Sequence, residues 1–228
     1  ALRSSFSAEE KEAAIGAPLA EMKEKRIVAI GDIANSPDTL GFPRGSRMPI
    51  QTFIEALGST EEKAADRFSF SEQLYQRFAA QEADFILRQS IVPHAPYSIS
   101  EKLFSLLNAY GAGQTLSIHS QETAAENEWY ERKAGGLQHF YEALSIDTGF
   151  FRPSGKTSLQ TWLPWLDRPA RLILVHNTFI SEADIAFLGR PEQDIFLCLC
   201  PRANLYIERR LPPVARLDAS GLDICLGT

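Results

Sequence analysis

The sequence has few of the features that mark secreted, membrane-bound or nucleic-acid-binding proteins. It contains three cysteines in 228 residues, too few for a disulfide framework. It has no apolar run of about 18 residues that could span a membrane, and neither a signal peptide nor a lipidation motif. The formal net charge of −6 leaves no basic face for nucleic acid and no polybasic patch for a membrane surface. We therefore expect a cytoplasmic protein whose partners are neither nucleic acids nor membranes.

The cysteines give little sign of a metal-binding knuckle. Cys198 and Cys200 stand two residues apart in an apolar run, and alternation along a strand would place both side chains on one face. The Cys-x-x-Cys spacing of zinc knuckles is absent, as is the Pro-Cys-x-x-Cys signature of the cytidine deaminases. We interpret these two residues as small, buried, apolar side chains.

What the sequence does contain is a regular alternation of strand-like and helix-like segments. Short apolar runs predict strands at 26–30, 91–94, 114–119, 171–176, 195–200 and 222–226. Helical patterns cover 7–24, 61–88 with a possible break at 69–71, 100–110, 124–133, 137–144, 158–166 and 181–188. Residues 36–49, rich in glycine and proline, are expected to form a loop, whereas 50–57 fits either a strand or a helix.

This alternation is typical of parallel βα units and predicts an α/β fold of the (β/α)8 TIM-type barrel class. The length suits one large domain, which we expect to cover residues 1–228. A (β/α)8 barrel usually takes about 250 residues. Because the sequence begins on a helix and ends within a strand, we expect an incomplete barrel that lacks the first strand and the end of the last.

Three of the four histidines close strand-like runs. His94, His119 and His176 follow Ser-Ile-Val-Pro, Thr-Leu-Ser-Ile and Leu-Ile-Leu-Val, respectively. A neutral imidazole is the commonest protein ligand of transition metals, and strand ends are where an α/β barrel carries its reactive groups. Three histidines at strand ends therefore predict one shared metal site. His139 lies within a helical segment, and we expect it at the surface or in packing.

Glu122 follows His119 by three residues and falls in the turn after a predicted strand. From there its carboxylate could move protons between an attacking water and a leaving group, as a general acid/base. The alternative is that Glu122 caps the helix that follows. The combination with the other two strand-end histidines favours the catalytic interpretation.

Two further residues are candidates for contact with a substrate. His94 is flanked by Pro93 and Pro96, whose fixed φ angles would hold its ring in place, although structural rigidity alone is the alternative. Asn204 comes soon after a predicted strand, where an Asx turn that opens a helix is the alternative. Structural roles are favoured for three other polar residues near the barrel mouth, Asp32, Asn35 and Glu55. Packing roles are favoured for three aromatic residues that could otherwise stack on a base, Phe151, Trp162 and Trp165.

Five motifs occur in a fixed order along the chain: Pro-His94-Ala-Pro-Tyr-Ser, Ile-His119-Ser-Gln-Glu122, Leu-Val-His176-Asn, Cys200-Pro-Arg-Ala-Asn204 and Leu-Gly-Thr228. In this order they resemble the amidohydrolase superfamily. More narrowly, they are similar to its branch of metal-dependent deaminases and chlorohydrolases, which includes adenosylhomocysteine and guanine deaminases. The resemblance runs from about Arg26 to Thr228 and covers nearly the whole chain.

The resemblance implies a metal-centred barrel with one divalent metal, zinc in the first place and iron in the second. His119 and His176 would be metal ligands, and Glu122 would be the proton shuttle. His94 would contact the substrate or the attacking water, and we group Asn204 with it as substrate-binding. Water activated by the metal would attack a ring carbon that bears an amino group, so that ammonia leaves. The implied substrate is a purine, a pterin or a related heterocycle, and the implied assembly is a homodimer.

Two alternatives stay open. One is hydrolysis of a cyclic amide or a chlorinated ring by the same residues, and the other is a non-catalytic barrel that serves binding or assembly. The second is motivated by two expected ligand groups without a counterpart here, a His-x-His pair on the first strand and an aspartate directly after Thr228. We therefore expect this span alone to be inactive. The segment Thr39–Arg47 is unusual for this branch, and we expect it to be mobile or to belong to the substrate mouth.

Overall fold

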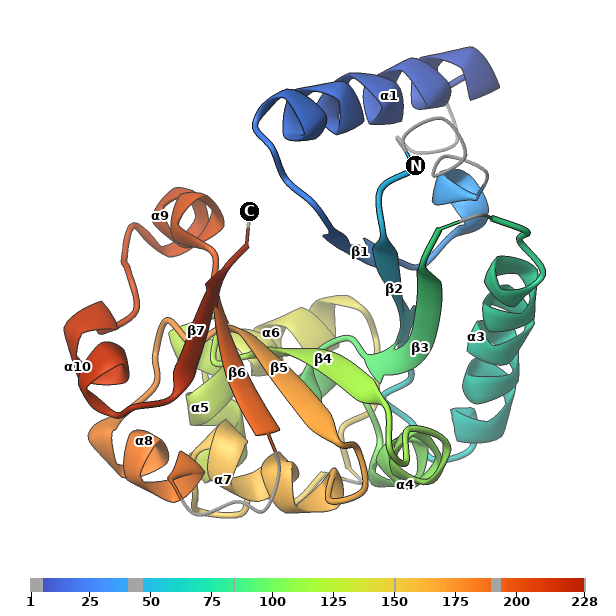
Figure 1. Cartoon of the computed structure of the whole chain (residues 1–228). Coiled ribbons are helices and arrows are strands. Elements are labelled where there is room, and N and C mark those ends of the chain that lie inside the picture. Colours follow the sequence, from blue (N-terminus) through green and yellow to red (C-terminus); the bar gives the residue numbers. More distant parts are fainter. Residues whose placement is uncertain (1–5, 41–46, 84, 150, 190–193, 228) are drawn as a thin grey trace.

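The structure, a computed structural model, is a curved wall of parallel strands with helices along its outer side (Figure 1). It describes residues 6–40, 47–83, 85–149, 151–189 and 194–227. The strands in these residues are β1 (Ile30–Ala34), β2 (Ile50–Ala56), β3 (Leu87–Pro93), β4 (Thr115–Ser120), β5 (Arg171–His176), β6 (Asp194–Leu199) and β7 (Asp223–Leu226). They pair in parallel and in chain order, as one sheet of β1-β2-β3 and a second of β4-β5-β6-β7.

The two sheets meet at β3 and β4. The backbone amide of His119 donates to the carbonyl of His94 (2.9 Å), and the Ser90 hydroxyl donates to the carbonyl of Thr115 (2.9 Å). The parallel α/β fold with strands in barrel order is therefore confirmed. Among the described residues β1 and β7 are both edge strands, so these residues form an open wall and not a closed barrel.

Helices precede and connect the strands, and most of the connecting helices lie along the convex side of the wall (Figure 1). They are α1 (Ala8–Glu24), α3 (Ala64–Ala79), α4 (Glu101–Tyr110), α5 (Ala124–Arg132), α6 (Gly136–Ala143), α7 (Ser158–Trp162), α8 (Glu182–Leu188), α9 (Pro201–Glu208) and α10 (Val214–Ala219). The sequence analysis missed α9 and α10, which are short and begin at or just after prolines. In the described part of the chain, no helix is long and apolar enough to cross a lipid bilayer.

The prediction of a strand at 26–30 is wrong, because the strand begins where those residues end. Arg26 adopts a left-handed φ of 61° at the end of α1, and Val28 is 79% exposed. Pairing begins at Ile30, whose partner is Ile50 of β2. A strand forms where a neighbouring strand offers hydrogen bonds, and an apolar run without such a neighbour does not become one.

The helical prediction for 61–88 is wrong at its C-terminal end. Helix α3 ends at Ala79, and the last two predicted residues instead open β3, because they pair with the start of β2. The possible break at 69–71 is not observed, since α3 continues through these residues, where the Ser71 hydroxyl donates to the carbonyl of Arg67 (3.3 Å). The ambiguous segment 50–57 forms β2, which pairs on both sides.

The predicted loop at 36–49 contains one short 3-10 turn, Pro37–Thr39. Residues 41–46 lie outside the described residues, and with them most of the segment Thr39–Arg47 that was expected at the substrate mouth. Thr228 of the fifth motif also lies outside them.

The main apolar core lies between the strands and the outer helices. In β4, Leu116 and Ile118 point into this core, so the alternation of the strand turns His119 to the opposite, concave side. Trp162 is fully buried in the core, and its ring stacks on that of Phe104 with centroids 6.4 Å apart. The packing role predicted for Trp162 is therefore confirmed.

Replacing Trp162 with alanine is expected to lower the free energy of unfolding by about 3–5 kcal/mol, because it removes a large buried ring and leaves a cavity. Urea unfolding would measure the change. The control is Tyr206→Ala, since Tyr206 is 89% exposed and its loss should change stability by less than about 0.5 kcal/mol. Equal effects of the two substitutions would contradict the packing described here.

Candidate active site

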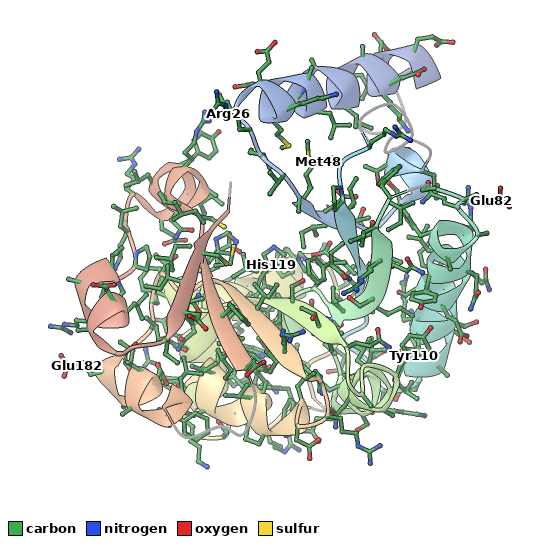
Figure 2. The ribbon with its side chains drawn as sticks, viewed as in Figure 1. Arg26, Met48, Glu82, Tyr110, His119 and Glu182 are labelled. Atoms are coloured by element: carbon green, nitrogen blue, oxygen red, sulfur yellow. The ribbon has the colours of Figure 1, made fainter. Side chains whose placement is uncertain are left out.

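The candidate functional side chains gather at the C-terminal ends of the strands. Figure 2 shows His119 near the centre of the molecule, inside the curve of the wall, whereas Glu82 and Glu182 lie at its rim. In the register of β4 and β5, Ser120 is the partner of His176, which brings the ends of the two strands level. Parallel strands end at a common edge, so residues far apart in sequence meet there.

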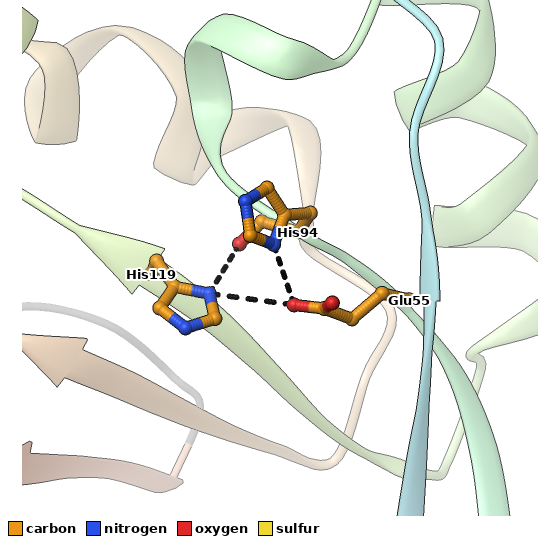
Figure 3. A group of neighbouring side chains, drawn as sticks. All are labelled: Glu55, His94 and His119. Carbon is orange, nitrogen blue, oxygen red and sulfur yellow. Dashed lines mark hydrogen bonds and ion pairs between the residues drawn. The ribbon is translucent and has the colours of Figure 1, made fainter. Parts of the chain in front are cut away.

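Glu55, His94 and His119 form a group on three neighbouring strand ends (Figure 3). His94 Nδ1 lies 2.5 Å from Glu55 Oε1, and His119 Nδ1 lies 3.6 Å from the same oxygen. His119 Nδ1 also lies 2.8 Å from the carbonyl oxygen of His94. One potential ligand atom from each residue lies within 4.8 Å of the others, so the group is compact enough for a shared cation.

Burial and charge act together on this group. Burial by itself raises the pKa of Glu55, but the hydrogen bond and positive charge of His94 outweigh it, so that the pKa is lowered. Burial lowers the pKa of His119 and favours the neutral ring. Burial, and then the negative charges of Glu126, Glu122 and Glu55, raise the pKa of nearby Tyr97 to about 12. The site is therefore electronegative and contains neutral imidazole, a setting that favours a cation.

His176 faces the same space from β5. Its ring stacks on that of His119, with centroids 5.3 Å apart, and its Nε2 lies 3.4 Å from Glu122 Oε1. Its Nδ1 lies 2.7 Å from Asn204 Oδ1, so Asn204 orients the ring from α9. His176 and Asn177 both have left-handed φ angles, 78° and 55°. A left-handed backbone conformation is energetically costly for residues other than glycine, and such residues cluster at functional sites.

The hydrogen bonds of the two metal-ligand candidates determine which nitrogen is free. His119 Nδ1 faces a backbone carbonyl, and His176 Nδ1 faces the oxygen of Asn204. Both partners are acceptors, so a neutral ring at either position places its proton on Nδ1 and its lone pair on Nε2, which in His176 lies 3.4 Å from Glu122 Oε1. Metal-ligating histidines are usually oriented by such a bond from the second ring nitrogen. These bonds leave Nε2 as the nitrogen of each ring that could bind a metal ion, although His176 is not part of the compact group of Glu55, His94 and His119.

The turn that carries Glu122 is held by a buried network. Gln121 has a left-handed φ of 48°, and its N–H donates to Glu126 Oε1 (2.9 Å), which also accepts from the Ser158 hydroxyl (2.6 Å). The side-chain amide of Gln121 donates to Asp184 (2.9 Å). The backbone amides of the turn before α5 thus donate to the carboxylate of Glu126. The carboxylate of Glu122 instead faces His176.

Stability should depend on the protonation of Glu126, which is fully buried. Burial raises the pKa of this carboxyl to about 7, so the folded protein holds its proton more tightly than the unfolded chain does. Stability is then lost as the pH rises from about 5 to about 8. Glu126→Gln keeps an acceptor oxygen without a titrating proton. Its unfolding free energy should therefore lose about 3 kcal/mol less than that of the wild type over this range. Parallel pH profiles of the two proteins in urea unfolding would contradict this expectation.

The sequence analysis did not recognise two carboxylates of this region, Glu55 beside the histidines and Glu126 behind the Glu122 turn. Glu55 was assigned a structural role, although it is the one charged residue of a strand-like apolar run and stands near its carboxyl end. Glu126 belongs to no motif that the sequence analysis singles out. Asp32 lies elsewhere, where its carboxylate accepts from Thr39 (2.9 Å) and burial raises its pKa. The side chain of His139 is 81% exposed, as predicted for a surface residue.

Parallel βα units with imidazole and carboxylate groups at the C-terminal strand ends are the arrangement of metal-dependent α/β-barrel hydrolases. The chain belongs to the amidohydrolase family, whose model matches residues 23–228. The resemblance seen in the sequence motifs is thereby confirmed.

Individual relatives agree with the family match. The aminodeoxyfutalosine deaminase of Deinococcus radiodurans is 26% identical over 208 residues, covering 87% of this chain and 49% of the relative. The solved structure of Helicobacter pylori aminofutalosine deaminase has a TM-score of 0.77 at 22% identity and covers 95% of this chain and 53% of that one. An adenosine deaminase from Xanthomonas campestris with bound zinc has a TM-score of 0.64 at 19% identity, covering 99% and 47%. The chain spans about half the length of the curated relatives it matches.

Proposed function

We propose that this chain contributes the catalytic residues of a metal-dependent aminohydrolase that removes the amino group of an adenosine-type purine as ammonia. The observation that carries the proposal is the contact of Glu122 with His176, whose ring stacks on His119 at the strand ends. The family supports it, as do the names of two curated relatives, an adenosine deaminase and an aminodeoxyfutalosine deaminase.

His119 and His176 are the proposed metal ligands, through the Nε2 atoms that their hydrogen bonds leave free. The ionised carboxylate of Glu55 lies beside His119 and adds negative charge that favours a cation. A divalent ion held there, zinc as in one matched structure or iron, would make a water molecule acidic enough to react near neutral pH.

Glu122 is the proposed acid/base. Its carboxylate takes a proton from the attacking water and delivers a proton to the amino group that leaves, so that one residue serves both steps. His94 and Asn204 are the proposed substrate contacts. The Glu55 carboxylate fixes the His94 ring, and the amide nitrogen of Asn204 is buried without a partner among the described residues. A single domain over residues 1–228, a cytoplasmic location and a homodimer stay predictions.

The test is made on the complete natural protein that contains this chain. Elemental analysis should find about one zinc or iron ion per chain. A panel of adenosine, 5′-substituted adenosines, guanine, a pterin, a cyclic amide and a chlorotriazine should show ammonia release with the adenosine-type compounds. Ring opening of the amide or chloride release would instead favour the alternative hydrolases. Metal-free protein without turnover would favour a binding or assembly role.

A further inference from the structure

The three cysteines of the sequence gather beside the candidate active site, at the carboxyl ends of β6 and β7. Cys198 and Cys225 are direct partners in the register of the two strands, and Cys200 directly follows β6. A Cβ atom on Gly227 would meet the sulfurs of Cys200 and Cys198 at 2.8 and 2.9 Å. Interactions with the thiols of Cys200 and Cys225 are also the largest causes that raise the pKa of the Cys198 thiol. The three thiols therefore form one cluster.

The cluster corrects part of the sequence interpretation. Cys198 and Cys200 share one face, as predicted, and Cys200 is buried at 4% exposure. Cys198, however, is half-buried, and Cys225 is exposed. The reason is that Cys225 lies in a strand that pairs with β6 on one side among the described residues. At least one thiol of the cluster is thus open to small solutes.

We propose that Cys198 and Cys225 are a reactive thiol pair, which closes to a disulfide when a hydroperoxide reaches the protein. Neighbouring strands lie about 4.8 Å apart. This spacing falls within the Cα separation of about 4.4–6.8 Å that disulfides require. The two residues are direct partners in the register of β6 and β7, so closure needs no shift in register.

The chemistry balances with the peroxide as the oxidant. The Cys225 sulfur attacks one peroxide oxygen and the O–O bond breaks. The other oxygen departs as water, and Cys225 becomes a sulfenic acid. The Cys198 sulfur then attacks the sulfenic sulfur, and a second water carries away the hydroxyl group and the thiol proton. Two thiols and one hydrogen peroxide become one disulfide and two waters, and the two electrons come from the sulfurs.

Two features of the cluster support this assignment of roles. The hydrogen bond from Cys198 lowers the pKa of the Cys225 thiol to about 7, so a large part of this exposed group is the reactive thiolate near neutral pH. Cys198 is the sulfur that contacts both others, which makes it the resolving partner. The link would lie beside the site, because Cys200 is in hydrogen-bond contact with the backbone of His176.

The experiment treats the complete reduced protein with hydrogen peroxide, blocks the remaining thiols with iodoacetamide and maps tryptic peptides by mass spectrometry. Trypsin cleaves after Arg202 and Arg216, so Cys198 and Cys225 fall in different peptides. The expected result is a cross-linked pair of peptides in which Cys200 is alkylated. Dithiothreitol should return both peptides to the alkylatable form.

Three variants make the assignment specific. Cys200→Ser should keep the cross-link, whereas Cys198→Ser and Cys225→Ser should each abolish it. A link from Cys200 to Cys225 that survives in Cys198→Ser would overturn the proposed pair. So would sulfinic acid on Cys225 without any cross-link in the wild type, a result that needs no variant to fold. A bond within the peptide that contains Cys198 and Cys200 would overturn it as well.

Discussion

Glu122→Gln is expected to lower kcat for an adenosine-type substrate by about a thousand-fold, within the range that loss of a general acid/base produces. Glutamine has nearly the shape of glutamate but cannot take up and return a proton. The Glu122 carboxylate lies 3.4 Å from Nε2 of His176, a proposed metal ligand. Metal content and KM should change little, because the proposed ligands and substrate contacts are other residues.

Steady-state ammonia release, together with elemental analysis of the same preparation, measures this effect. The matched control is Glu142→Gln, since the Glu142 side chain is 60% exposed on α6 and should leave kcat unchanged. If Glu122→Gln kept more than about a tenth of the wild-type kcat, proton transfer by Glu122 would not be part of the rate-determining chemistry. If it lost its metal as well, Glu122 would have to be counted among the ligands.

Much of the site could be predicted because its residues stand at positions that strand geometry dictates. His119 and His176 close apolar runs, and parallel strands bring such positions to one edge. The Glu122 turn followed from its place directly after a strand. What sequence could not provide was the set of partners. Asn204 and His176 are 28 residues apart, and their contact depends on how α9 packs beside β5.

Glu55 illustrates a second limit. Its partner His94 is 39 residues away, and an acidic residue in an apolar strand can face either the core side or the concave side. Which face it takes is decided by the register of β2 between two neighbours, and a shift of one residue would reverse it. The prediction of a strand at 26–30 was wrong for the same reason, because an apolar run does not specify where pairing with a neighbouring strand begins.

His119→Ala and His176→Ala are each expected to reduce bound metal by more than about ten-fold. Loss of residues that merely orient ligands already costs about 10–100-fold in affinity, and a missing ligand should cost at least as much. The two rings stack with centroids 5.3 Å apart, and Nδ1 of each faces an acceptor. The control is His139→Ala, whose side chain is 81% exposed on α6.

The amount of metal bound per chain after dialysis, measured on the complete protein, tests His119 and His176 separately as ligands. Thermal unfolding of each variant with and without added zinc shows whether a folded protein has lost its stabilisation by the ion. If His119→Ala kept its metal, the proposed ligand set would be wrong as a whole. If His176→Ala alone kept it but lost turnover, His176 would instead act with Glu122 in proton transfer. The hydrogen bond between His176 and Asn204 would then orient a catalytic ring. The metal ion would be bound by His119 together with groups near Glu55.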